Sequence, residues 1–245
     1  QPASGDSGGS LGAALAYYYS LNKRNLKKRN DSMKSSYLGL SFSDEIIEKN
    51  LIKNNIKYTK LEYSEMIDRI SKKISDGSVI GWMQDKMEFG PRALGNRSII
   101  ADPRSKSMQK NLNLKIKFRE SFRPFAPSVL EDYLDEWFDI PIHNEYMLFV
   151  GNVREDKRTN NSNKKNSKIN NLSTINEQRS LVPAITHVDY SARIQSVSKK
   201  NNKKFYDLIS SFKKYTGCPM LVNTSFNVRG EPIVCNVNDA LNCFF

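Results

Sequence analysis

The stretch KKFYDLISSFKKYTGCPMLVNTSFN (203–227) holds a helix pattern that leads directly into a strand pattern. Its first part repeats apolar side chains at the spacing of one helix face, namely Phe205, Leu208, Ile209 and Phe212. We predict a helix over residues 203–216 with these side chains turned inward. The short apolar run from Met220 to Asn223 predicts a strand. A helix followed at once by a strand is typical of an α/β domain.

The same alternation continues towards the N-terminus. Apolar spacing predicts a helix that starts near Tyr63 and ends near Asp76 and Gly77, and residues 79–83 predict a buried strand. The pattern SDEI (43–46) predicts the capped start of another helix. The remaining expected elements are helices over 8–19, 43–54 and 106–116 and extended segments over 124–130 and 184–197. The whole pattern predicts an α/β fold.

A formal net charge of +12 is a weak guide to function. Clustered lysines and arginines can bind nucleic acid, because they release counterions from a phosphate backbone. Much of the excess, however, lies in Lys/Asn-rich runs at 22–30, 157–171 and 199–204, which lack interleaved aromatics and are typical of solvated surface. Residues 154–180 hold almost no apolar side chain before Leu172, so we predict a flexible insertion there.

Several kinds of protein are not indicated. The three cysteines form no CxxC pair, which argues against a disulfide framework or a zinc site and favours a cytoplasmic location. No segment approaches the roughly 20 apolar residues of a membrane helix. Residues 1–10 show no signal-peptide pattern. The chain starts without methionine and stops at Phe245 inside an expected helix, so we expect both ends to be cut.

The densest chemical motif is MEFGPRALGNRSIIADPR (87–104). Glycines and prolines fix the backbone around Arg92, Arg97 and Arg104, and guanidinium groups held on loops can bind phosphate or carboxylate bidentately. This pattern predicts an anion site. The alternative is that Arg92 or Arg97 only ties its loop to Glu88 or Asp102.

Two further motifs favour the anion site. The stretch KIKFRESFRPFAP (115–127) alternates cations with apolar residues, so its cations would share one face of an extended chain. The stretch NTSFNVRGEP (223–232) offers amide, hydroxyl and guanidinium donors on a turn after a strand. Together, the three motifs predict a pocket for a small anion.

Five stretches carry a resemblance to a known family. They are PASGDSGGSLGAAL (2–15), MEFGPRALGNRSIIADPR (87–104), IKFRESFRPFAPSV (116–129), THVDYSARIQSV (186–197) and TGCPMLVNTSFNVRGEPIV (216–234). In these stretches the chain resembles the carbamoyltransferases typified by nodulation protein U and the antibiotic O-carbamoyltransferases. The resemblance covers nearly the whole chain apart from a connector and the insertion.

The resemblance implies two domains. An N-terminal domain of the actin-like ATPase type would transfer the carbamoyl group, and a YrdC-like α/β domain, with a mixed twisted sheet and flanking helices, would make the activated donor. Residues 1–36 would be a remnant of the transfer domain, 37–60 a connector and 61–245 the YrdC-like domain. We therefore expect this fragment to activate carbamoyl phosphate without completing the transfer.

The resemblance also implies a reaction. Carbamoyl phosphate is cleaved, carbamate attacks the α-phosphate of ATP, and carbamoyl-adenylate forms with release of pyrophosphate. A hydroxyl of a sugar or metabolite then accepts the carbamoyl group at a site that contains a divalent metal, iron or magnesium. The implied partners are carbamoyl phosphate, ATP and this acceptor, and a homodimer is compatible with the resemblance.

The implied site residues fall into three groups. Catalytic cations around carbamoyl phosphate would be Lys117, Arg193 and Arg229. Substrate-binding residues would be Arg92, Arg97, Arg119, Arg123, Asn223, Ser225, Asn227 and His187, with the three residues at 223, 225 and 227 as hydrogen-bond donors. Asp6 would be a metal ligand, and because one carboxylate alone binds a cation weakly, we predict weak or no metal binding by this fragment.

The chain departs from the family pattern at two places. Tyr190-Ser191 stands where the family shows Gly-Thr, and Asp85-Lys86 replaces Gly-Arg. We expect both changes to reshape the nucleotide side of the pocket. We rank two alternatives below the enzyme: a YrdC-like module that binds double-stranded RNA or a nucleotide, and an inactive fragment kept as a partner-binding domain.

Overall fold

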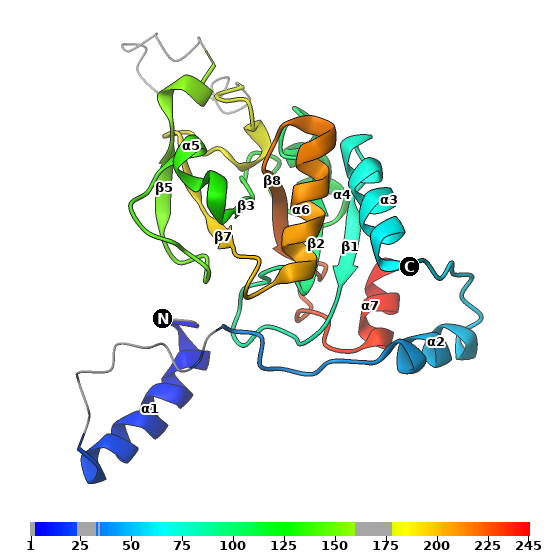
Figure 1. Cartoon of the computed structure of the whole chain (residues 1–245), viewed down its shortest axis with the longest axis vertical. Helices are drawn as coiled ribbons and strands as arrows, with labels where there is room; N and C mark the ends of the chain where they lie inside the picture. The colour runs from blue at the N-terminus through cyan, green and yellow to red at the C-terminus, as the bar shows by residue number, and fades with distance from the viewer. Residues whose placement is uncertain (1–2, 24–32, 34, 160–177) are drawn as a thin grey trace.

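The computed structural model describes residues 3–23, 33, 35–159 and 178–245 (Figure 1). Its helices are α1 (Asp6–Leu21), α2 (Asp44–Lys53), α3 (Tyr63–Ser75), α4 (Met108–Lys115), α5 (Leu134–Trp137), α6 (Lys203–Thr216) and α7 (Val237–Phe244). Its strands are β1 (Ile80–Met83), β2 (Arg97–Ala101), β3 (Ala126–Leu130), β4 (Phe138–Asp139), β5 (Val150–Val153), β6 (Ser191–Arg193), β7 (Gln195–Val197) and β8 (Met220–Ser225). The short 3₁₀ helices are Glu131–Tyr133, Glu155–Lys157 and Pro183–Ile185.

The larger sheet has five strands in the order β1-β2-β8-β3-β7. Strand β8 lies in the middle and runs antiparallel to both β2 and β3, whereas β7 runs parallel to β3. The sheet is therefore mixed and has helices packed around it, which confirms the predicted α/β class (Figure 1). The YrdC-like and actin-like assignments of the two parts stay predictions.

A smaller antiparallel sheet of β4, β5 and β6 lies beside the first. Only Ile194 separates β6 from β7, so the chain passes directly from the small sheet into the large one. The single extended segment predicted over 184–197 is wrong in this respect. Pro183 starts a 3₁₀ turn, and Asp189 accepts hydrogen bonds from the backbone and hydroxyl of Ser191, which closes a tight turn before β6.

The core forms where α3 and α6 pack on each other and α6 covers the large sheet (Figure 1). The four apolar side chains predicted to face inward from α6 are all fully buried, which confirms the helix and its orientation. On α3, Ile67 and Ile74 are buried against them. Burying apolar side chains is the main favourable contribution to folding, so this layer carries much of the domain's stability.

The N-terminal elements lie at the edge of this core. Helix α2 begins as predicted, with the Ser43 side chain accepting a hydrogen bond from the Ile46 amide. Helix α1 buries none of its side chains and projects from the sheets (Figure 1). Within the described residues, no helix has the length and apolar character that crossing a bilayer requires.

Parts of two predicted segments lie outside the described residues. These are 1–2, 24–32 and 34 of the predicted remnant and 160–177 of the predicted insertion. The base of the insertion is described, and there the Thr159 amide donates to the Arg179 carbonyl at 3.0 Å.

Gly95 offers a test of the core beneath the arginine-bearing loop. Its φ is +107°, and a β-carbon there would overlap Cδ1 of Phe205. Gly217, with φ +72°, ends α6 facing open space. We expect Gly217→Ala to cost about 1 kcal/mol, from left-handed strain alone, and Gly95→Ala to cost about 3 kcal/mol, because overpacking adds to that strain. Urea unfolding of both variants checks this, and equal costs would contradict the packing shown.

Candidate functional site

The strand directions gather several chain segments at one edge of the large sheet. Because β8 is antiparallel to its neighbours, its last residues lie beside the first residues of β2 and β3, with Ser225 opposite Ser98 and Asn223 opposite Ala126. Strand β7 is parallel to β3 and so begins at the same edge, with only Ile194 between it and Arg193. The end of β8 thus meets the loops that precede three other strands.

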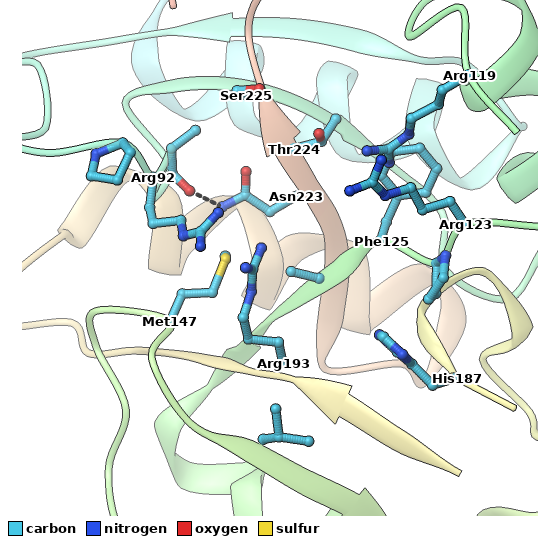
Figure 2. Close-up of a pocket in the computed structure, with 15 residues that line it drawn as sticks. Arg92, Arg119, Arg123, Phe125, Met147, His187, Arg193, Asn223, Thr224 and Ser225 are labelled. Carbon is cyan, nitrogen blue, oxygen red and sulfur yellow. Dashed lines mark hydrogen bonds between the residues drawn. The ribbon is translucent and has the colours of Figure 1, made fainter. Parts of the chain in front are cut away.

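A pocket of about 410 Å³ opens at this edge (Figure 2). The loop before β2 and the segment before β3 contribute arginines, and the small sheet contributes another. The basic residues that line it are Arg92, Arg119, Arg123, Arg193 and His187. No described residue of the lining carries a carboxylate. The lining includes residues of all three sequence motifs, and its unbalanced positive charge makes the pocket suited to an anion.

Arg193 and Arg92 approach each other across the pocket (Figure 2). Desolvation lowers the pKa of Arg193, and the nearby charge of Arg92 lowers it further. The Nε of Arg193 is buried and has no hydrogen-bond partner in the described part of the chain. Among the described residues, no carboxylate forms an ion pair with either arginine. Both side chains therefore keep donors free for a ligand.

Arg119 and Arg123 line the opposite wall (Figure 2). The Arg119 guanidinium lies 4.8 Å from the centre of the Phe125 ring, and its Nε donates to Asn113 at 2.6 Å. Desolvation, and then the charge of Arg123, lowers the pKa of Arg119. This stacking fixes the guanidinium plane while its remaining nitrogens stay available.

The cations of residues 115–123 do not share one face, contrary to the extended chain we predicted. Phe118 adopts a left-handed backbone with φ +46°, which turns the chain between Lys117 and Arg119. Lys117 consequently points towards the turn after β8, while Arg119 reaches the pocket.

Lys117 lies behind the pocket wall and does not line the cavity. Its ammonium donates to the carbonyl oxygens of Ser225 at 2.6 Å and Asn227 at 2.9 Å, and to the Asn227 side chain at 2.8 Å. Burial lowers its pKa to about 8. In this arrangement Lys117 fixes the turn after β8, and the Ser225 hydroxyl is already engaged, because it accepts from Lys117 at 3.2 Å and donates to Asn227 at 2.6 Å.

Asn227 and Arg229, which belong to the turn after β8, also lie outside the pocket lining. Arg229 is exposed and donates to the Phe118 carbonyl at 3.0 Å. The Asn227 side chain accepts from Ser225 at 2.6 Å. The structure therefore brings Arg193 together with three other arginines, and leaves Lys117 and Arg229 on the far side of the Ser225 wall.

Asn223 lines the pocket and holds an unpaired acceptor. Its Nδ2 faces three acceptors, namely the Ala93 carbonyl, the Ser128 hydroxyl and Oε1 of Gln195. Its Oδ1 is buried and has no hydrogen-bond partner among the residues that the structure describes (Figure 2). We predicted this amide as a donor, but the donor is already engaged. The free group is the oxygen, and a buried acceptor left unpaired costs free energy until a ligand donates to it.

Arg97 supports the arginine-bearing loop from inside. Its side chain is fully buried and donates to several carbonyls, including those of Gln84 at 2.7 Å and Leu40 at 3.1 Å. Glu88 Oε1 accepts from the amides of Leu94 and Asn96 at 2.6 and 2.8 Å. Arg97 therefore ties its loop, as the alternative foresaw, but through carbonyl oxygens.

Arg92 is not tied to its loop in this way, since Glu88 and Asp102, the two carboxylates that could have paired with it, have other partners. Glu88 is held by backbone amides, and Asp102 pairs with Arg104 at 2.7 Å. The loop is thus rigid while Arg92 stays free to face the pocket.

His187 and Asp6 complete the predicted set. His187 lines the pocket, and desolvation together with the charge of Arg193 lowers its pKa, opposed by Asp189. Asp6 is exposed in the first turn of α1. The described residues hold no cluster of three or more His, Cys, Asp or Glu side chains that fits a metal ion. Asp6 alone does not make such a site, so its metal role stays a prediction.

Some lining residues carried no signal that we recognised. Thr224 lies between two predicted residues within NTSF. Met147 reaches the pocket from the loop before β5 through a left-handed backbone with φ +53°. Of the two departures from the family pattern, Asp85 forms an exposed ion pair with Lys204 and does not line the pocket.

A family model described as Carbamoyltransferase C-terminus matches residues 71–245. The chain belongs to the carbamoyltransferase family. Over its whole length it is 47% identical to an uncharacterized protein of Synechocystis sp., sll1178, and covers 40% of it. It is 40% identical over its whole length to nodulation protein NolNO of Sinorhizobium fredii and covers 33% of that protein.

A further relative carries an enzyme name. The 3'-hydroxymethylcephem-O-carbamoyltransferase of Amycolatopsis lactamdurans is 34% identical over 70% of the chain, which covers 28% of that enzyme. These matches confirm the family predicted from the sequence motifs. The chain spans less than half the length of each of these relatives.

The buried carboxyl of Glu88 predicts a pH dependence of stability. Desolvation raises its pKa above the ordinary 4.5, despite the amide hydrogen bonds. Its contribution to stability is therefore full below about pH 4.5 and is lost as the pH rises through the folded-state pKa. Glu88→Gln keeps the acceptor oxygen and removes the titration. We expect the stability of the wild type relative to Glu88→Gln to fall as the pH is raised from 4.5 towards neutrality, by at most about 1.4 kcal/mol per pH unit. Urea unfolding across this range measures it, and a difference that rises with pH would show that the hydrogen bonds dominate.

Proposed function

We propose that the chain forms the carbamoyl phosphate site of an ATP-dependent O-carbamoyltransferase. The observation that carries this proposal is that four arginines line one pocket together with Asn223, whose buried Oδ1 has no partner among the described residues. Carbamoyl phosphate matches both features, because it carries a phosphate group and a carbamoyl NH₂ group. Family membership supports the same substrate.

The phosphate binds between Arg92 and Arg193 in this proposal. Their guanidinium groups carry free donors, and their mutual repulsion is relieved when an anion lies between them. The carbamoyl NH₂ then donates to Asn223 Oδ1, which satisfies the buried acceptor. Arg119 and Arg123 add positive charge from the opposite wall.

The same cations assist the chemistry. Cleavage of carbamoyl phosphate by water gives carbamate and phosphate, and negative charge builds on the phosphate oxygens as the bond to the carbamoyl carbon breaks. Fixed guanidinium groups stabilise that charge without reorganising. Carbamate next attacks the α-phosphate of ATP, forming carbamoyl-adenylate and releasing pyrophosphate.

Lys117 and Arg229 keep a supporting place in this proposal. They lie beside the Ser225 wall, and their charges add to the positive potential of the pocket. The acceptor is a hydroxyl of a sugar or metabolite, and one relative is named for a hydroxymethyl acceptor. The YrdC-like fold, the cytoplasmic location, a homodimer and a divalent metal at the transfer step belong to the same proposal. No step here runs through the metal, because Asp6 is the sole ligand predicted for it.

Arg193→Ala tests the phosphate contact. We expect this variant to bind carbamoyl phosphate at least about 30-fold more weakly, since charge-assisted hydrogen bonds are lost. Arg69→Ala on the exposed face of α3 removes the same charge far from the pocket and should bind normally. Isothermal titration calorimetry of the full protein measures both. Equal affinity for wild type and Arg193→Ala would refute the site, and double-stranded RNA binding that survives physiological salt would favour the RNA-binding alternative instead.

Acetyl phosphate tests the role of Asn223. It replaces the carbamoyl NH₂ with a methyl group of similar size, which cannot donate to Oδ1 and leaves the acceptor unpaired. We expect it to bind about tenfold more weakly than carbamoyl phosphate. Competition between the two ligands checks this, and equal affinities would show that the pocket reads only the phosphate.

A further inference from the structure

Tyr190 adopts a backbone conformation that aromatic residues rarely take. Its φ is +65°, in the left-handed region where a β-carbon crowds the following carbonyl. The turn that requires this conformation is closed by two backbone hydrogen bonds. The Tyr190 amide donates to the His187 carbonyl at 3.0 Å, and the His187 amide donates to the Ser191 carbonyl at 2.9 Å.

This turn places two residues of the pocket. It begins at His187, which lines the cavity, and it ends at Ser191, the first residue of β6, which carries Arg193 into the cavity. The orientation of both side chains therefore depends on the backbone of this turn.

The strained residue is held by a cation from a distant part of the chain. The guanidinium of Arg158 lies over the Tyr190 ring, 4.8 Å from its centre. Arg158 is itself fixed, because its Nε donates to the Val153 carbonyl at 2.8 Å. The Val153 amide in turn donates to the Tyr190 carbonyl at 2.8 Å. Val153 of β5 thus hydrogen-bonds to both Arg158 and Tyr190, the two residues of the cation–π contact.

Arg158 is anchored on its other side as well. It forms a β-bridge with Ser180, and the amide of Leu181 donates to the carbonyl of Lys157 at 3.0 Å. The Arg158 guanidinium therefore contacts the ring from a pair of segments, 157–158 and 180–181, whose backbones are hydrogen-bonded to each other. We call this pair the stem.

We propose that Arg158 and Tyr190 are positioning residues for the anion pocket. Stacking of the guanidinium on the ring offsets the left-handed strain and holds the His187–Ser191 turn, so that His187 and Arg193 face the ligand. The inference rests on the proposed function for the identity of the anion, but the placement of His187 can be measured without any ligand.

Arg158→Ala removes the stacking partner and leaves the turn sequence intact. The matched control is Lys157→Ala, which removes the neighbouring cation of the same stem, one that lies over Trp137 and not over Tyr190. Tyr190→Gly removes the ring and the left-handed strain together. The full protein is used for all variants, and thermal unfolding shows that each one is folded.

The first readout is the pKa of His187 in the ligand-free protein, followed by NMR. The chain has only one other histidine, His143, so His143→Gln assigns the signals. Loosening the turn exposes the imidazole and moves Arg193 away, which should raise the His187 pKa towards its ordinary value of 6.5 in Arg158→Ala but not in Lys157→Ala. A contact that only stabilised the fold would leave this pKa unchanged in the folded protein.

The second readout is calorimetric affinity for inorganic phosphate and carbamoyl phosphate. We expect Arg158→Ala to weaken both by about fivefold, in the range of a partly exposed cation–π contact. Adding Arg158→Ala to Tyr190→Gly should bring no further loss, since the ring is already gone.

An unchanged His187 pKa in Arg158→Ala, or effects of Arg158→Ala and Tyr190→Gly that simply add, would overturn the inference. If the wild type bound neither anion, the proposed function would fail, and the His187 titration alone would then decide whether the turn is held as inferred.

Discussion

The pairing of β8 with β2 and β3 is the constraint on which the site depends. Because β8 is antiparallel to both neighbours, its C-terminal residues must lie beside the loops that precede those strands. Those loops carry Arg92 on one side and Arg119 and Arg123 on the other. A shift of one residue in either register would turn Asn223 to the opposite face of the sheet. The buried hydrogen bonds of the Asn223 amide to Ser128 and Gln195 tie three adjacent strands in this register.

The positive charge of the pocket is uncompensated within the described residues, whereas the charged groups of the surrounding loops have hydrogen-bond partners. The fully buried Arg97 side chain donates hydrogen bonds to loop carbonyls, and the Glu88 carboxylate accepts hydrogen bonds from loop amides. Arg92 and Arg193 repel each other and have no carboxylate partner in the described part of the chain. Such an arrangement costs stability, and an anion that binds between the two arginines recovers it. The loops around the pocket are therefore held by hydrogen bonds, while Arg92 and Arg193 line the cavity.

Sequence patterns predicted the helices well because one-face apolar spacing is a local property. The buried face of α6 and the Ser43 start of α2 are of this kind. The alternating cations of residues 115–123 misled us, because a left-handed Phe118 breaks the extended chain and separates Lys117 from Arg119. The single strand expected over 184–197 was wrong for a related reason. A turn at Asp189 interrupts it, and at Ile194 the chain passes from one sheet to the other, because β6 and β7 pair with strands that are distant in the sequence.

The sequence by itself determined the family and the chemical character of the site, since motifs such as NTSFNVRGEP and FGPRALGNR hold their residue types within a few positions. It did not separate arginines that face a ligand from arginines that support a loop. Arg92 and Arg97 are five residues apart in the same motif, yet one lines the pocket and the other is fully buried. Only the tertiary structure decided this, because a guanidinium donates to whatever acceptors the fold brings within reach, and most of those acceptors come from strands and loops distant in the sequence.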